Sequence, residues 1–245
     1  MQFLPVDDPN YLYLPSRNPY WQKIKDLSAG ALIDHDTEQF RGKWRALFRS
    51  IEPSFPWTEN TPLNVEIGCN GGHVTLGLAA QNPDQLFIGI DWKFKQIYLA
   101  QEKAQKRSIR NAIFLRARAE RLHYIFDEGE VDTLRLFFPD PWQKKSQKKH
   151  RYIRANYFDR AAQVVRSGGA FEIRTDHDDY FQWMLDAHQE ASKNWKKEAL
   201  TWNAHENHPN PLELQIPEVT LFERLFIRDG IPIKKLILSR ACIEQ

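Results

Sequence analysis

Residues 63–72 read Leu-Asn-Val-Glu-Ile-Gly-Cys-Asn-Gly-Gly, and this stretch decides how the rest of the chain is interpreted. The apolar run at 63–67 predicts a short buried strand, and the glycines after it predict a tight turn into a helix over 73–80. A second apolar run at 85–90 ends on Asp91. A strand, a turn, a helix and another strand in this order predict a βαβ unit with parallel strands.

The same alternation continues downstream, with helices expected over 93–107, 154–165 (stopped by the glycines at 168–169) and 178–190, and strands over 112–115, 131–138 and 170–174. Near the end, 219–227 and 231–238 flank Arg228-Asp229-Gly230, and Asp-Gly between apolar runs predicts a two-stranded hairpin. Residues 195–217 show no regular pattern. We therefore predict an α/β fold, with a mostly parallel sheet, helices on both faces and a C-terminal antiparallel hairpin.

Residues 1–60 have a different composition, because prolines and aromatic residues are scattered through them without strand-like alternation. One helix is expected over Thr37–Arg49, with Asp36 as its N-cap. We therefore divide the chain into an arm, 1–60, and a main domain, 61–245. The arm either packs on the main domain through its aromatic side chains or, in its first 20 residues, becomes ordered on a partner.

Overall composition excludes few classes of protein. The 245 residues suffice for one large domain, and 34 Lys and Arg against 32 Asp and Glu leave a net charge of only +2. Any charged partner must therefore be inferred from local clusters. The sequence has no signal-peptide pattern and no run of 18 apolar residues, and its two cysteines lie far apart. These features predict a cytoplasmic protein that does not associate with a membrane.

Two carboxylates flank the first βαβ unit. Asp91 ends the second strand about 20 residues after the glycine turn, where a carboxylate suits the two hydroxyls of a ribose. The turn matches neither G-x-G-x-x-G nor a Gly-Lys-Ser/Thr loop, which argues against a dinucleotide site and excludes a P-loop. Glu66 lies inside the first strand, where an unpaired carboxylate is costly to bury. It either meets a cationic group of a ligand or pairs with an arginine of the core.

The second motif is 137–151, Phe-Phe-Pro-Asp-Pro-Trp-Gln-Lys-Lys-Ser-Gln-Lys-Lys-His-Arg. The prolines on either side restrict the backbone of Asp140, which follows a strand and so lies at the carboxyl edge of the sheet. The basic residues after it are suited to RNA phosphates, and Trp142 to stacking on a base or a ribose. These basic residues are Lys144, Lys145, Lys148, Lys149 and Arg151. The alternative is that the basic run is simply a solvated loop.

Other polar clusters carry less information alone. Asp176 follows the fifth strand, and Thr220-Leu221-Phe222-Glu223 enters the terminal hairpin, so both are expected near the same edge. His205 and His208 have no cysteine companion and lie in an Asn/Pro-rich segment, so no metal site is predicted. A serine hydrolase would need a Gly-x-Ser-x-Gly elbow, which the sequence lacks.

Together these motifs resemble those of the bacterial tRNA (guanine-N7)-methyltransferases. The resemblance extends from about residue 64 to 240 and is strongest in Phe-Phe-Pro-Asp-Pro-Trp-Gln-Lys-Lys. The other matching blocks are Val-Glu-Ile-Gly at 65–68, Phe-Ile-Gly-Ile-Asp at 87–91, Thr-Asp at 175–176, Thr-Leu-Phe-Glu at 220–223 and Leu-Ser-Arg at 238–240.

The resemblance implies a Rossmann-like methyltransferase fold, S-adenosyl-L-methionine as cofactor, tRNA as partner and a guanine in its variable loop as the methylated base. It implies Asp140 as the catalytic residue, and as cofactor-binding residues Glu66, Gly68, Asp91, Glu120 and Asp140. The substrate-binding residues that it implies are Lys144, Asp176, Thr220, Leu221, Phe222 and Glu223. The expected contacts to the RNA backbone are Lys145, Lys148, Lys149 and Arg151. Whether the protein is a monomer or a homodimer stays open.

The sequence departs from the family at three places. Asn70 replaces a glycine of the first turn, Arg118 lies where an adenine-binding Asp is usual, and Leu221 replaces a lysine. Glu120 is the candidate substitute for the missing Asp. These departures keep two other hypotheses open, namely a non-catalytic RNA-binding relative and a methyltransferase with a different RNA or small-molecule acceptor.

Overall fold

The computed structural model describes residues 4–13, 17–27, 30–208, 210 and 219–242. Its strands are β1 (Ala31–Ile33), β2 (Leu63–Ile67), β3 (Leu86–Asp91), β4 (Ala112–Arg116), β5 (Val131–Phe137), β6 (Val165–Thr175), β7 (Trp195–Thr201) and β8 (Lys234–Arg240). Its α-helices are α1 (Pro19–Lys25), α2 (Trp44–Ile51), α3 (His73–Gln81), α4 (Phe94–Lys106), α5 (Leu122–Ile125), α6 (Ala155–Val164), α7 (Asp178–Glu190) and α8 (Leu221–Arg228). Short 3-10 helices are η1 (Asp34–Phe40), η2 (Ala119–Arg121), η3 (Lys145–His150) and η4 (Ser192–Asn194).

The eight strands form one sheet in the order β1-β4-β3-β2-β5-β6-β8-β7. The pairs from β1 to β6 are parallel, whereas β8 runs antiparallel to both β6 and β7. After β2 the chain builds the sheet toward β4 and then returns to add β5, so the strand order reverses between β2 and β5. Loops diverge at such a switch point and leave a crevice at the carboxyl ends of the strands.

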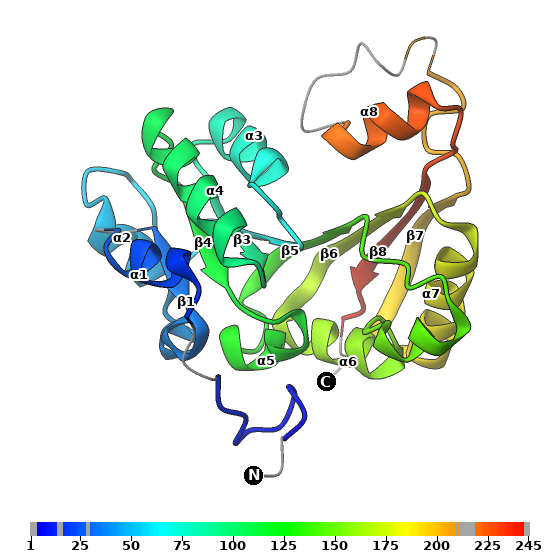
Figure 1. Ribbon diagram of the computed structural model, residues 1–245, viewed down its shortest axis with the longest axis horizontal. Helices are drawn as coiled ribbons and strands as arrows, with labels where there is room; N and C mark the ends of the chain where they lie inside the picture. The colour runs from blue at the N-terminus through cyan, green and yellow to red at the C-terminus, as the bar shows by residue number, and fades with distance from the viewer. Residues whose placement is uncertain (1–3, 14–16, 28–29, 209, 211–218, 243–245) are drawn as a thin grey trace.

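Helices cover both faces of the sheet. Buried residues of α1, α3 and α4 form one apolar cluster, and those of α2, α5, α6 and α7 belong to a larger cluster on the other face. Figure 1 shows α3 and α4 above the sheet and α5 and α6 below it. The predicted fold class, a mostly parallel α/β sheet with helices on both faces, is therefore confirmed.

The predicted terminal hairpin exists, but its first strand is a different segment. Residues 219–227, expected as a strand, contain the helix α8, because Thr220 and Glu223 form a capping box. The strand that pairs with β8 is instead β7, within the segment 195–217 that showed no pattern. Of that segment, residues 209 and 211–217 lie outside the described residues. Gly230, expected in the hairpin turn, follows the end of α8 with a φ of +71°.

Two further local predictions were wrong. The helix expected over 37–49 is divided into η1 and α2, because Gly42 adopts a φ of +73° and the Glu130 carboxylate accepts hydrogen bonds from the N–H groups of Gly42 (2.9 Å) and Trp44 (3.3 Å). Glu130 thus caps α2 from 86 residues away, and Asp36 lies within η1. The glycines at 168–169, expected as a helix stop, lie inside β6.

The first 60 residues contribute directly to the main sheet. β1 pairs in parallel with β4, while Trp44 and Phe48 of α2 are buried in the larger apolar cluster. The domain boundary at residue 60 remains a prediction, but these contacts join the two segments into one packed unit.

Candidate active site at the switch point

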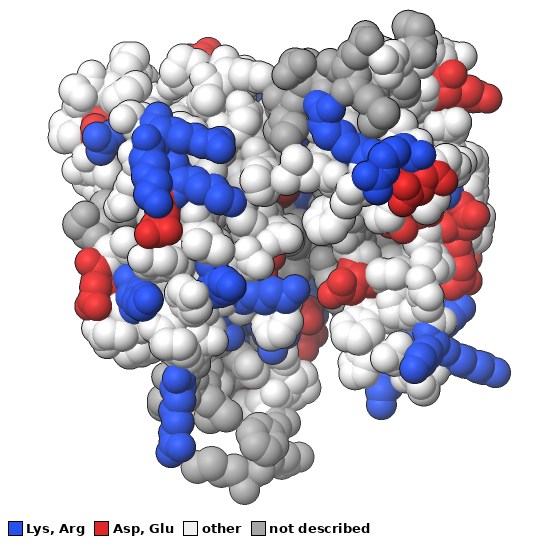
Figure 2. All heavy atoms as spheres, turned by 45° about the horizontal axis from the view of Figure 1, so that its top comes forward, with Lys and Arg blue, Asp and Glu red and all other residues white. Residues whose placement is uncertain are grey.

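A cavity of about 810 Å³ lies at the carboxyl ends of β2, β3 and β5. Figure 2 shows the molecule hollowed between the part that carries α3 and α4 and the part that carries α8. The candidate residues that line the cavity are Glu66, Gly68, Asp91, Glu120, Asp140, Thr220, Leu221 and Phe222. The fold thus brings together residues that are up to 156 positions apart in the sequence.

Glu66 presents one carboxylate oxygen to this cavity. The backbone N–H of Thr75 (3.0 Å) and the Thr75 hydroxyl both donate to Oε2, so the bonds to α3 fix the carboxylate. Oε1 has no hydrogen-bond partner among the described residues and can accept from a ligand. Burial raises the pKa of Glu66, while the Thr75 bonds and the charge of Arg135 oppose that rise. A cationic ligand group would stabilise the ionised form further.

Asp91 is held by the backbone around it. Its Oδ2 accepts from the N–H of Asn70 at 3.0 Å and its Oδ1 from the N–H of Lys93 at 2.8 Å. Each carboxylate oxygen keeps a lone pair for a further donor. Burial raises the pKa of Asp91, and the same two N–H groups oppose that rise. The geometry suits a pair of hydroxyl donors.

The turn between the two carboxylates leaves room for a ligand. Gly68 has a φ of +76°, and a Cβ built on it would meet no atom within 4 Å, so the space in front of its backbone is open. Asn70, the first departure from the family pattern, has a φ of +49°. Asn tolerates this left-handed conformation better than most residues, so it can replace a glycine here.

The Pro-Asp-Pro turn is flanked by strained backbone. Phe138 and Trp142 have φ values of +51° and +45°, which bulky residues adopt only when the surrounding structure holds them there. The Phe138 N–H donates to the carbonyl of Arg174 at 2.9 Å, which ties the start of the turn to β6. Asp140 is exposed at the tip and lines the cavity. The turn therefore holds one carboxylate at the cavity wall.

Arg151, predicted to contact the RNA backbone, is buried beneath the Pro-Asp-Pro turn. Its side chain is 0% exposed, and it donates to the carbonyl of Pro141 (2.8 Å) and to Asp179 (2.8 Å). The guanidinium also lies over the ring of Tyr180, at 4.7 Å. Its burial argues against the predicted contact with the RNA backbone, which stays a prediction. In this structure Arg151 holds the Pro-Asp-Pro turn against α7. A basic run in a sequence does not reveal which of its members is buried.

The lysines of the basic loop differ in their surroundings. Lys144, Lys145 and Lys149 are exposed around η3, whereas Lys148 forms an ion pair with Asp179 at 2.9 Å. None of the four lines the cavity. They lie beside its mouth, on the same segment as Trp142 and His150, whose rings line it with centroids 5.1 Å apart.

Among the substrate candidates near β6 and α8, two lie behind the cavity wall. Glu223 is 0% exposed, caps α8 and binds Arg174 (3.1 Å) and His205 (3.2 Å). These contacts argue against its predicted contact with a substrate, which stays a prediction. Burial raises the pKa of Glu223, but the His205 bond and the Arg174 charge outweigh this, so it is lowered. Asp176 is partly buried and outside the cavity.

Several residues that line the cavity were not singled out from the sequence. Trp92 is 49% exposed, and the guanidinium of Arg118 lies 5.2 Å from its ring centroid. Tyr152, His73 and Lys103 also line the cavity. Trp92 could have been found from the sequence, because it directly follows Asp91. Lys103 and His73 could not, because they become neighbours only through the packing of α4 on α3.

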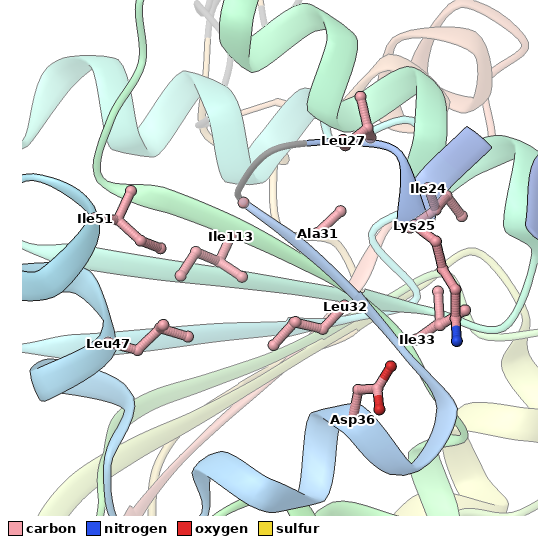
Figure 3. Close-up of a pocket in the computed structure, with 11 residues that line it drawn as sticks. Ile24, Lys25, Leu27, Ala31, Leu32, Ile33, Asp36, Leu47, Ile51 and Ile113 are labelled. Atoms are coloured by element: carbon pink, nitrogen blue, oxygen red, sulfur yellow. The ribbon is translucent and has the colours of Figure 1, made fainter. Parts of the chain in front are cut away.

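A second cavity of about 400 Å³ lies between α1, β1 and α2 (Figure 3). Its lining is mainly aliphatic, and among the residues that the structure describes only Lys25 and Asp36 contribute charged side chains to it. None of the predicted site residues lines it. Among the described residues no group of three His, Cys, Asp or Glu side chains could hold a metal ion, and no helix there is long and apolar enough to cross a bilayer.

Comparison with known proteins decides the family. Residues 60–236 match the family model described as "Putative methyltransferase". The tRNA (guanine-N(7)-)-methyltransferase of Lachnoclostridium phytofermentans is 33% identical over 209 residues, which cover 85% of this chain and 90% of that protein. This chain belongs to the tRNA (guanine-N7)-methyltransferase family. A bifunctional glycosyltransferase/methyltransferase of Fusobacterium nucleatum is 29% identical over 90% of this chain, but the chain spans only 33% of that protein.

Solved structures support the fold of this methyltransferase independently. The 16S rRNA methyltransferase KamB superposes with a TM-score of 0.55 at 19% identity, covering 80% of this chain and 94% of KamB. An antibiotic-related methyltransferase superposes with a TM-score of 0.56 at 16% identity, with the same coverage. At such identities the likeness establishes the fold alone.

Proposed function

We propose that this chain transfers a methyl group from S-adenosyl-L-methionine to N7 of a guanine in tRNA, with a variable-loop guanine as the target. The family supports tRNA guanine as the substrate. The observation that carries the proposal is that Glu66, Asp91 and Asp140 line one cavity, each from a different strand end.

The cavity fits the proposed cofactor. When bound, S-adenosyl-L-methionine supplies a methyl group activated by a sulfonium. Oε1 of Glu66 is free to accept from its amino group, and the two oxygens of Asp91 suit the ribose hydroxyls. The open space at Gly68 lets the ligand approach the backbone. Of the other residues that line the cavity, we assign Glu120 and the exposed ring of Trp92 to binding of the adenine.

The protein's task in the reaction is mainly alignment. Guanine N7 is a lone-pair nucleophile without a proton, so no general base is required. Holding two reactants in line is worth roughly 7–11 kcal/mol in favourable cases. Asp140 would accept hydrogen bonds from the guanine N1–H and amino group and stabilise the positive charge that develops on the purine. The strained turn and Arg151 keep that carboxylate in place.

A direct assay tests the proposal. Incubation of the protein with unmodified tRNA and a cofactor labelled in its methyl group should yield 7-methylguanosine after nucleoside digestion. Sequencing of the modified tRNA then locates the base. Label in another nucleoside, or in no nucleoside despite measurable cofactor binding, would overturn the proposal and favour a different acceptor or a non-catalytic RNA-binding role.

A further inference from the structure

A cluster of basic side chains lies on the α3–α4 side of the cavity, away from the strand that leads to Asp140. The ammonium group of Lys103 donates to the carbonyl of Gly71 at 2.8 Å and lies 3.4 Å from Nε2 of His73. Gly71, His73, Gln96 and Lys103 all line the cavity. The functions assigned above to Glu66 and Asp91 do not use this end of it.

No carboxylate of the described residues balances the charges in this cluster. Burial lowers the pKa of Lys103, and Arg107, one helical turn further on, lowers it again. The pKa of His73 is lowered by burial and then by both cations. Among the described residues, neither Lys103 nor Arg107 forms an ion pair with a carboxylate. Cations held together without a counterion attract an anionic ligand.

The positive surface continues outside the cavity. Lys95 and Lys106 of α4 and Arg107 just after it are exposed, and the only acidic partner for them in the described part of the chain is Glu102, 3.9 Å from Lys106. Figure 2 shows Lys and Arg side chains gathered on this side of the molecule. A small ligand confined to the cavity would not reach these groups, whereas a nucleic-acid backbone passing over the mouth would.

A second basic surface lies on the other side of the cavity mouth. Figure 1 shows α4 and α7 over different halves of the sheet, with the switch point between them. The loop with Lys144, Lys145 and Lys149 adjoins α7 through the Lys148–Asp179 ion pair. The cavity mouth therefore lies between two basic surfaces.

We propose that His73, Lys103 and Arg107 bind a phosphate of the RNA backbone on the flank opposite the 144–149 loop. This inference rests on the proposed function, because it assumes an RNA substrate. It assigns to α4 and its C-cap, Arg107, a share of the RNA-backbone contacts that the sequence motifs place in the loop after Asp140.

The test uses the full chain with Lys103→Gln and Arg107→Gln combined. Gln at 103 keeps a donor for the Gly71 carbonyl while removing the charge. Each phosphate contact contributes about 0.7–0.9 to the slope of log affinity against log salt. We expect the tRNA Kd of the double variant to rise about tenfold near physiological salt and the slope to fall by about 0.7–0.9, the contribution of one phosphate. Arg107→Gln alone should give about half of that change in slope.

Lys193→Gln combined with Lys197→Gln is the matched control, because it removes two exposed cations near the far edge of the sheet. Binding of S-adenosylhomocysteine, measured by calorimetry, should be unchanged in both double variants. The inference is overturned if the Lys103/Arg107 variant shows the slope of the control, or if only its S-adenosylhomocysteine Kd rises, which would indicate a cofactor carboxylate as the anion. Wild-type protein that binds tRNA but forms no 7-methylguanosine would instead contradict the proposed function.

Discussion

The guanidinium of Arg151 donates a hydrogen bond of 2.8 Å to the carbonyl of Pro141, the residue that follows Asp140. A buried cation thus holds the backbone of the turn that carries the proposed catalytic carboxylate. Asp179, bound to the same guanidinium at 2.8 Å, anchors it to α7. The position of Asp140 therefore depends on contacts made behind the cavity wall.

Replacement of Arg151 by Lys should lower turnover without weakening tRNA binding. Lysine keeps the charge but cannot bond Pro141 and Asp179 at once with the same geometry. Because small displacements of aligned groups are costly, we expect kcat to fall about tenfold to a hundredfold. Steady-state kinetics with Arg166→Lys as control will measure this. Unchanged kcat in the Arg151 variant would show that the turn holds its geometry without this bond.

The Asp179 anchor gives a pH dependence. Hydrogen bonds from Arg151 and Lys148 lower the pKa of Asp179 from 3.8 to about 2. A lowered folded-state pKa stabilises the protein fully above pH 3.8, and this contribution is lost as pH falls toward 2. The Tm difference between wild type and Asp179→Asn should therefore shrink across that interval. A difference that stays constant down to pH 2 would argue against the ion pair.

Asp91→Asn should weaken cofactor binding. Loss of a charged acceptor for two hydroxyl groups predicts a rise of about ten- to a hundredfold in the Kd of S-adenosylhomocysteine. Calorimetry measures this directly, and Asp84→Asn, in the exposed turn before β3, is the control. Equal affinities in the two variants would exclude Asp91 from the cofactor site.

The main effect of Glu223→Gln should be to destabilise the fold, with little change in substrate contacts. It leaves Arg174 and His205 without their buried carboxylate, so the free energy of unfolding should fall by about 3 kcal/mol. The pKa of Glu223 is lowered from 4.5, so its contribution is present above pH 4.5 and is lost as pH falls through the lower folded value. Denaturant unfolding with Glu128→Gln as control tests this. A wild-type unfolding curve combined with a raised KM for tRNA would favour the substrate role instead.

The first half of the sheet could be predicted because its signals are local. Alternating apolar runs, the glycine turn and Asp91 lie within 30 residues and fix β2, α3 and β3. The cap that Glu130 provides for α2 comes from 86 residues away, and no local pattern shows it. The helix α8 could have been predicted, because Thr-x-x-Glu at 220–223 is a capping-box sequence. The apolar run at 219–227 and the Asp-Gly after it favoured a hairpin instead.

The location of the candidate site and its carboxylates could be predicted from the sequence, but the burial and contacts of its basic residues could not. The predicted order of strands and helices correctly placed Glu66, Asp91 and Asp140 around one cavity. It could not separate the buried Arg151 from its exposed lysine neighbours, because burial depends on Asp179 and Tyr180 of α7. Nor could it show that Lys103 reaches Gly71, since this depends on how α4 packs against α3.

Asp140→Asn, assayed with labelled cofactor and unmodified tRNA, tests the central claim most directly. Asn keeps the size of the side chain but removes the charge aimed at the guanine. We predict that turnover falls about a hundredfold or more, while the tRNA Kd stays within a factor of about three and the control Asp186→Asn retains full activity. Methylation by the Asp140 variant at the wild-type rate would contradict the account.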